Sequence, residues 1–194
     1  TMNSDLRHMD YAARLGRRAL GTTAENPSIG CVIVKDEQIG VIGWTQPGGR
    51  PHAETEALRR AGDAARGATA YVTLEPCSHH GRTPPCCEAL AEAGIARVVM
   101  AMRDPDPRVN GRGLAMLRGA GIAVEEGLLE AEARALNAGF FRRIQAGMPV
   151  VTLKLASTLD GRIATATGES RWITGAAARR EVHALRARHD AILV

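Results

Sequence analysis

The sequence predicts an α/β fold built on a mixed sheet with helices on both of its faces. Short apolar runs alternate with amphipathic stretches along most of the chain, which is the pattern of strands alternating with helices. The first two runs, 29–34 and 39–44, are separated only by the polar residues Lys35, Asp36 and Glu37. This arrangement predicts a hairpin, and a hairpin makes one strand pair antiparallel.

The other elements are predicted by the spacing of apolar residues and by the turn residues between them. The expected helices, in chain order, are 5–20, 53–60, 86–93, 113–118 and 129–146. The expected strands after the hairpin are 68–74, 97–102 and 122–125. Both junctions that precede the helices at 53 and 86 place polar side chains at a helix N-terminus, where the helix dipole favours thiolates.

The pattern changes after Gly147, Met148 and Pro149. The C-terminal segment predicts a strand, a short segment, a helix and the beginning of a buried parallel strand, at 150–155, 172–174, 176–188 and 190–194. So few elements do not complete a sheet. We therefore expect two domains, 1–147 and 148–194, of which the second is the truncated opening of a larger domain.

Composition limits the class of function. The 194 residues are 45% hydrophobic, which is enough for one packed core and the start of another. The chain has neither an apolar run of about 18 residues nor an N-terminal signal pattern, so we expect a cytoplasmic protein without a membrane partner. Aromatic residues make up 3%, too few for a base-stacking surface, so we expect no nucleic-acid partner. The net charge of +4 fits a phosphorylated small molecule and ordinary surface charge equally well.

Four residues predict a catalytic zinc site. His52, Cys77 and Cys86 offer one imidazole and two thiolates, and three protein ligands leave a fourth position for water, as catalytic zinc sites do. Glu54 lies two residues from His52, where it can move the protons of that water. The order His-x-Glu followed by Pro-Cys and a second Cys is the zinc-deaminase pattern. Here eight residues separate the two cysteines, whereas the general pattern has two.

The remaining cysteines and acidic residues near this motif have simpler interpretations. Cys31 lies in an apolar run and is expected to be a buried core thiol. Cys87 follows a proposed ligand, and because neighbouring side chains point apart, we expect it to face away from the metal. Glu56 is expected on another helix face, in solvent. Glu75 is expected to hold the loop backbone by hydrogen bonds.

Several motifs together resemble one family. The chain closely resembles the riboflavin-biosynthesis bifunctional deaminase/reductase family in several segments. These segments are 51–54, 73–86, 104–107 together with 111–113, 153–161 and 168–174. The resemblance implies a cytidine-deaminase-like three-layer α/β/α sandwich, followed by the start of a dihydrofolate-reductase-like domain. It also implies zinc-dependent deamination of 2,5-diamino-6-(5-phosphoribosylamino)pyrimidin-4(3H)-one, with reduction of the ribosyl chain by NADP(H) in the second domain.

The resemblance further implies binding residues, each with a simpler alternative. Asn26 is expected at the ribose or base edge, although Asn-Pro turns also form for local reasons. His79 and Arg82, on the loop between the cysteines, are expected to bind the anionic substrate, and the role of His80 is left open. The simpler alternative is a rigid loop whose arginine is merely solvated. In the second segment the resemblance places substrate at Ser170 and Arg186 and NADP at Ala156 and Trp172. Without more of that domain, the four residues have equally good simple interpretations. Ser170 is then a turn residue, Arg186 a helix-surface residue, Ala156 a strand residue and Trp172 a packing residue.

Two other functions compete with this interpretation. A nucleoside or tRNA-base deaminase of the same fold is disfavoured by the cysteine spacing and the low aromatic content. A structural zinc-binding module is disfavoured by the three-ligand count and by Glu54. The sequence leaves the oligomeric state open, including a homo-oligomer.

Overall fold

The computed structural model describes residues 2–107 and 109–193 and divides into two compact units. The first unit ends at Pro149 and the second begins at Val150. No helix within the described ranges is long and apolar enough to cross a lipid bilayer.

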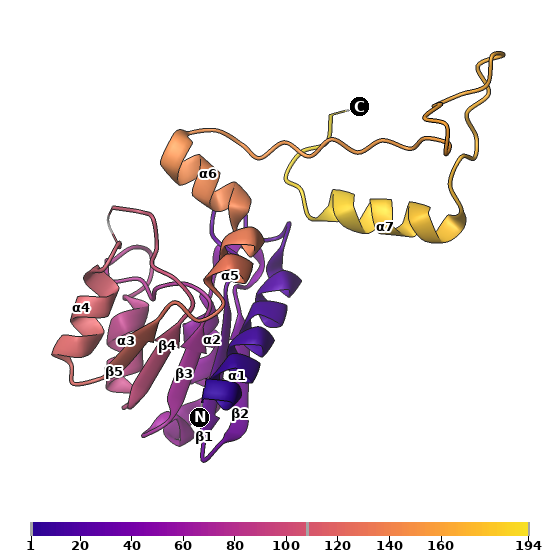
Figure 1. The fold of residues 1–194 in the computed structure, drawn as a ribbon. Coiled ribbons are helices and arrows are strands. Elements are labelled where there is room, and N and C mark those ends of the chain that lie inside the picture. Colours follow the sequence, from indigo (N-terminus) through magenta and orange to yellow (C-terminus); the bar gives the residue numbers. More distant parts are fainter. Residues whose placement is uncertain (1, 108, 194) are drawn as a thin grey trace. The chain divides into compact units, whose positions relative to one another are not determined.

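The first unit is built on a five-stranded sheet with the strand order β2-β1-β3-β4-β5 (Figure 1). The strands are β1 Gly30–Lys35, β2 Gln38–Trp44, β3 Thr69–Val72, β4 Arg97–Met100 and β5 Ala123–Glu126. Strand β1 is antiparallel to both β2 and β3, whereas β3, β4 and β5 run parallel. The hairpin and the mixed sheet predicted from the sequence are therefore confirmed.

Helices cover the sheet on both faces, which gives the three-layer α/β/α sandwich (Figure 1). The helices of this unit are α1 Met2–Gly16, α2 Ala53–Ala61, α3 Cys86–Glu92, α4 Arg112–Gly119, α5 Glu130–Leu136 and α6 Ala138–Ala146. Helix α1 packs on the central strands and contacts α5. Helix α2 packs on β1 and β2 and contacts α3, which in turn contacts α4.

The packing of α2 on the sheet is unusually close at its first turn. A Cβ atom on Gly43 of β2 would lie 2.2 Å from the carbonyl oxygen of Ala53, so only glycine fits there. The facing residues Ala53 and Ala57 are fully buried. Three small residues thus fix the N-terminus of α2 against the strand, and His52 and Glu54 belong to that same turn.

One edge of the sheet gathers the loops that carry the predicted motif. Strands β2 and β3 are both antiparallel to β1, so they run in the same direction as each other and as β4. Their carboxyl ends meet at one edge, which is where α/β proteins place their ligands. The N-terminus of α2, the loop 73–85 that precedes α3, and the loop 101–111 that precedes α4 all begin there.

Three sequence predictions about elements were wrong. The helix predicted at 129–146 is two helices, α5 and α6, separated at Asn137. No strand forms at 150–155 or at 190–193, and Val194 lies outside the described residues. The described part of the second unit offers no sheet for these apolar segments to join, so they have no ladder to complete.

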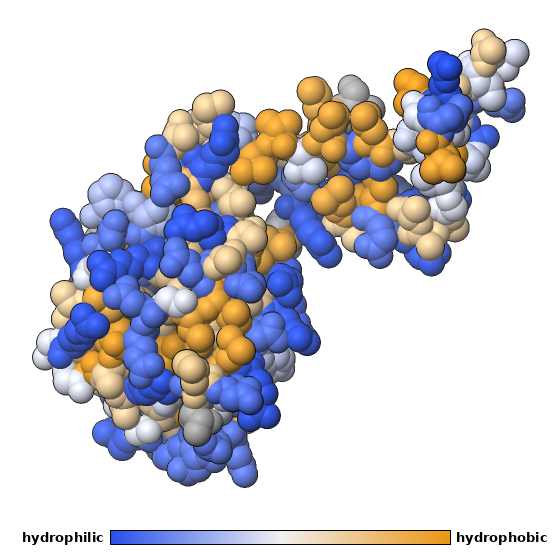
Figure 2. All heavy atoms as spheres, in the orientation of Figure 1, coloured by the Kyte–Doolittle hydropathy of each residue, from blue (hydrophilic) through white to orange (hydrophobic). Residues whose placement is uncertain are grey.

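The second unit has one helix among its described residues, α7 Ala176–Ala187, none of whose residues is buried. Apolar side chains of this unit face solvent: Val151 is 85% exposed and Leu153 is 80% exposed. Figure 2 shows hydrophobic residues gathered on the surface of this unit. The described residues of this unit leave these apolar side chains uncovered.

Candidate active site

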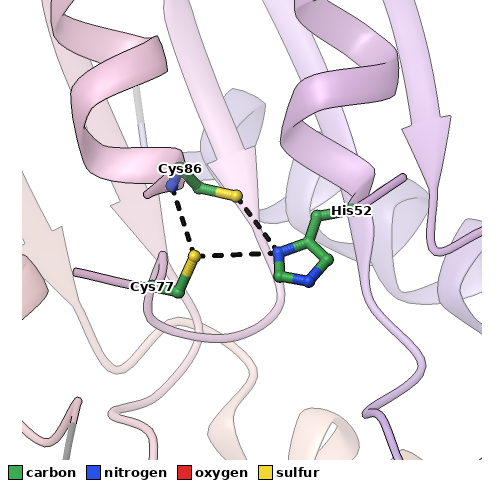
Figure 3. Close-up of side chains that lie close together, drawn as sticks. All are labelled: His52, Cys77 and Cys86. Atoms are coloured by element: carbon green, nitrogen blue, oxygen red, sulfur yellow. Dashed lines mark hydrogen bonds between the residues drawn. The ribbon is translucent and has the colours of Figure 1, made fainter. Parts of the chain in front are cut away.

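Three potential metal ligands converge at the carboxyl edge of the sheet (Figure 3). His52 is the N-cap of α2, Cys86 is the first residue of α3, and Cys77 lies in the loop after β3. His52 Nδ1 lies 3.3 Å from Cys86 Sγ and 3.7 Å from Cys77 Sγ. The backbone N–H of Cys86 donates to Cys77 Sγ at 3.2 Å, so the helix N-terminus contributes to the site.

This donor set fits a zinc ion. One ligand atom from each residue lies within 4.8 Å of the other two. The hydrogen bond from the Cys86 thiol, with further hydrogen bonds from His52 and the Cys86 backbone, lowers the pKa of Cys77 to about 4. A thiolate is the form that binds a metal, and metal binding replaces the protons shared within such a cluster. Three nitrogen and sulfur ligands leave a fourth tetrahedral position for water, as in catalytic zinc sites.

The structure also distinguishes the two nitrogens of His52, which the sequence does not. Nδ1 faces both thiols, whereas Nε2 lies 3.2 Å from Arg50 Nη1. Arg50 also donates to Thr83 Oγ1 at 3.0 Å, so it connects His52 to the loop between the cysteines. Sequence reasoning missed Arg50, because an arginine before a Pro-His pair carries no recognisable signal.

Glu54 lies beside the three ligands and is 4% exposed. Burial raises the pKa of Glu54 to about 7, and the nearby His52 opposes part of that rise. A general acid–base group works best when its pKa lies near the working pH. The carboxyl group is therefore held in an environment in which it can both accept and donate a proton.

A cavity of about 550 Å³ opens onto His52, Glu54 and Cys77. It is lined by Glu25, Asn26, Pro27, Ile29, Thr45, Gly49, Arg50, His52, Glu54, Leu74, Glu75, Cys77, His79, His80, Gly81, Arg82, Asp104, Asp106, Val109, Phe140, Arg143 and Ile144. The structure thus brings the predicted substrate residues Asn26, His79 and Arg82 to the same cavity as Glu54. Its volume is within the usual range for a small-molecule site.

Within this cavity, His79 and His80 differ in their surroundings. His79 Nδ1 is buried and has no hydrogen-bond partner among the described residues. A buried nitrogen without a partner is costly, so a ligand atom is a natural partner for it. His80 is exposed, and its Nε2 lies 3.5 Å from Glu88 Oε2.

Two cysteines remain outside the metal group, as predicted. Cys31 is fully buried in the core. The Cys87 thiol donates to the carbonyl oxygens of Pro76 and Gly113, at 3.2 and 3.6 Å. Burial raises the pKa of the Cys87 thiol, which keeps its proton in place for these bonds.

The prediction that Glu56 lies in solvent was wrong. It is 6% exposed rather than solvated. Arg59 and Arg60, on the next turn of α2, bind its carboxylate at 3.1 and 2.6 Å. Two guanidinium groups compensate the loss of water, so a carboxylate on a partly buried helix face is retained.

Helix α6 forms a cavity wall that sequence reasoning missed. Phe140, Arg143 and Ile144 all line the cavity. The break between α5 and α6 lies at Asn137, whose Oδ1 accepts from the Ser28 N–H at 2.7 Å and whose Nδ2 donates to the Ser28 carbonyl at 3.1 Å. These two bonds, between residues 109 positions apart in the chain, fix α6 to the turn that carries Asn26.

The predicted reductase-side residues all lie in the second unit. Ser170 and Arg186 are exposed, Ala156 is half-buried, and Trp172 is 70% exposed. The guanidinium group of Arg179 lies 4.3 Å from the centre of the Trp172 ring. Their roles toward substrate and NADP stay predictions.

Comparisons with known proteins agree with this site. The family model for the cytidine and deoxycytidylate deaminase zinc-binding region matches residues 2–102, and the model for the RibD C-terminal domain matches residues 149–194. The first match includes His52, Cys77 and Cys86. It therefore defines the first unit as a zinc-binding deaminase domain.

Individual relatives identify more narrowly which class of deaminase this chain resembles. The riboflavin biosynthesis protein RibD of Escherichia coli is 58% identical over 186 residues, covering 96% of this chain and 51% of that protein. The diaminohydroxyphosphoribosylamino-pyrimidine deaminase of Buchnera aphidicola is 49% identical over 146 residues, covering 75% of this chain and 99% of that protein. The solved structure of Acinetobacter baumannii RibD superposes with a TM-score of 0.88 at 53% identity, covering 97% of this chain and 53% of that one.

The chain belongs to the riboflavin-biosynthesis deaminase/reductase family. It spans about half the length of the E. coli and Acinetobacter relatives. It spans nearly the whole of the Buchnera deaminase.

Proposed function

We propose that this chain deaminates a phosphoribosylated diaminopyrimidinone, 2,5-diamino-6-(5-phosphoribosylamino)pyrimidin-4(3H)-one, by zinc-dependent hydrolysis. The observation that carries this proposal is the buried Glu54 carboxyl, which shares one cavity with His52 and Cys77, two members of the His52, Cys77 and Cys86 ligand group. The Buchnera relative, named as a deaminase of this type, supports the choice of substrate.

In the proposed reaction, His52 Nδ1 and the sulfur atoms of Cys77 and Cys86 hold the metal. Bound zinc supplies the Lewis acidity that makes water a nucleophile at neutral pH. The Glu54 carboxylate takes a proton from the attacking water and gives it to a ring nitrogen of the pyrimidine. It then takes the second proton and donates it to the departing amino group, which leaves as ammonia.

The cavity also offers partners for the rest of the substrate. Asn26 and His79 are proposed to bind the ring or ribose, since both line the cavity and the His79 Nδ1 atom needs a partner. Arg82 is proposed to bind the phosphate group, because a guanidinium matches phosphate geometry with two parallel hydrogen bonds. The cations Arg50 and Arg143 on the same cavity favour an anionic substrate.

For the second unit we propose the opening of an NADPH-dependent reductase domain, with the domain division at 147/148. The match of residues 149–194 to the RibD C-terminal domain supports this proposal. The ribosyl chain would be reduced in the longer parent, with Ala156 and Trp172 at NADP and Ser170 and Arg186 at the substrate. A cytoplasmic location is proposed as well, because two thiolate ligands need a reducing compartment.

The test is ammonia release by the zinc-loaded chain. The diaminopyrimidinone nucleotide is expected to release one ammonia per molecule, whereas cytidine and deoxycytidylate release none. Deoxycytidylate is included because the matching family model covers that class of deaminase. Turnover of deoxycytidylate without turnover of the diaminopyrimidinone nucleotide would replace the proposed function.

A further inference from the structure

The loop 73–85, which carries Cys77 and is called the metal loop below, contains a buried carboxylate that has no part in the proposed proton transfers. Glu75 is 3% exposed and lies two residues before Cys77. Its Oε2 accepts the backbone N–H groups of Asp104 and Gly111, at 3.2 and 3.0 Å. Its Oε1 accepts the backbone N–H of Leu114 at 3.1 Å. Three donors from one neighbouring segment thus converge on this single side chain.

These bonds join the metal loop to a second loop that lines the same cavity. The loop 101–111 lies between β4 and α4, and its residues Asp104, Asp106 and Val109 line the cavity. The Leu114 N–H belongs to the first turn of α4, where backbone donors have no partner within the helix. Glu75 therefore satisfies the start of α4 and, with the same carboxylate, the backbone of Asp104 and Gly111 in the loop before it.

Helix α4 also contacts the metal loop directly, backbone against backbone. A Cβ atom on Gly113 would lie 2.3 Å from the carbonyl oxygen of Pro76, so α4 approaches the metal loop as closely as a glycine allows. The Cys87 thiol donates to that same carbonyl oxygen and to the carbonyl of Gly113. This contact explains Gly113 of the Gly111-Arg112-Gly113 motif, and the positive φ of Gly111 (76°) explains the other glycine.

We propose that Glu75 is a positioning residue for deamination, which holds residues 101–107 and 109–111, the wall loop, at a fixed distance from the metal ligands. This inference rests on the proposed function. Substrate bound against Asp104, Asp106 and Val109 is then aligned with Glu54, although Glu75 itself exchanges no proton. Two of the three bonds end on the loop whose residues Asp104, Asp106 and Val109 line the cavity, and the third ends on the first turn of the helix that follows this loop.

The test is Glu75→Gln in the zinc-loaded chain. An amide has one oxygen, so its NH2 group must face at least one of the three backbone donors, and that bond is lost. The expected result is a fall of roughly 10- to 100-fold in kcat/KM for the diaminopyrimidinone nucleotide, mainly through KM, with zinc content unchanged. Amide hydrogen exchange of residues 101–107 and 109–114 is expected to be faster than in the wild type.

Glu56→Gln is the matched control. Glu56 is a similarly buried carboxylate, but it binds Arg59 and Arg60 on its own helix. This control is expected to lower the melting temperature without raising KM. Gly113→Ala provides a second variant, since it keeps the carboxylate but displaces α4 from Pro76, and we expect it to raise KM as well. A KM unchanged in Glu75→Gln, or raised equally by Glu56→Gln, would overturn the positioning role.

The exchange measurement separates this inference from the proposed function. If the wild-type chain releases no ammonia from the nucleotide, the proposed function fails. Faster exchange in the wall loop of Glu75→Gln, but not of Glu56→Gln, still supports the positioning role. Unchanged exchange in both variants overturns it, whatever the substrate.

Discussion

At the scale of single residues, Glu54 combines burial with a position next to three metal ligands. We predict that Glu54→Gln retains the fold and the zinc but loses roughly 10²–10⁴-fold in kcat, because an amide cannot carry the proton. Elemental analysis and ammonia release measure the two properties separately. Turnover close to that of the wild type would show that another group carries the proton.

Arg82 lies on the loop between the cysteines, exposed at the cavity. We predict that Arg82→Ala raises KM about 10- to 100-fold with little change in kcat, because a charge-assisted hydrogen bond to phosphate is lost. Arg82→Lys keeps the charge but not the paired geometry and is expected to lie between the two. A fall in kcat at constant KM would indicate instead that Arg82 orders the loop.

At the scale of elements, one ion pair ties helix α1 to strand β4. Asp5 accepts from Arg97 Nη1 and Nη2 at 3.0 Å each, and also from the Tyr71 hydroxyl. The hydrogen bonds from Arg97 are the main cause that lowers the pKa of Asp5 from 3.8 to about 2. Because the folded-state pKa lies below the unfolded one, this stabilisation is complete above about pH 4 and is lost as the pH falls through 2.

We therefore predict that Asp5→Asn lowers the free energy of unfolding by on the order of 2 kcal/mol at neutral pH. The difference from the wild type should shrink below about pH 4 and disappear near pH 2. Urea unfolding across this range measures it. Asp10→Asn, which breaks only the exposed pair with Arg14, is expected to change little. A difference that stays constant with pH would exclude the ion pair as its cause.

Elements whose apolar residues pack on neighbours close in sequence could be predicted from the sequence, and the hairpin and the helix at 53–60 are examples. The break at Asn137 could not, because its cause is a pair of hydrogen bonds to Ser28 that only the folded chain brings together. The motif spacing also predicted that His52, Cys77 and Cys86 come together, and the structure groups their ligand atoms within 4.8 Å of one another. The spacing did not reveal that α6 forms a cavity wall, since Phe140 and Arg143 carry no motif.

At the scale of the whole molecule, the two units differ in how well they bury their apolar residues. In the second unit Val151, Leu153 and Leu159 are at least 80% exposed, and no residue of α7 is buried. Exposed segments with few packed contacts open locally at little cost. We predict that trypsin cleaves within 150–193 first and leaves a fragment that retains zinc and deaminates at the original rate.

Mass spectrometry of the fragments, together with the ammonia assay, monitors this digestion. Added substrate should protect the loop between the cysteines but not the second unit, because Arg82 lines the cavity. Loss of deamination in step with cleavage of the second unit would mean that the first unit depends on the second.

The long interval between Cys77 and Cys86 bears on how such enzymes diverge. The two ends of this interval are joined by the hydrogen bond from the Cys86 backbone to Cys77 Sγ, and Cys86 is the first residue of α3. The residues between these ends supply His79 and Arg82 to the cavity. If His79 and Arg82 bind the substrate as proposed, replacements within this interval alter which molecule is selected. The interval would then carry substrate recognition, while its two ends and the first turn of α2 carry the metal ligands and Glu54.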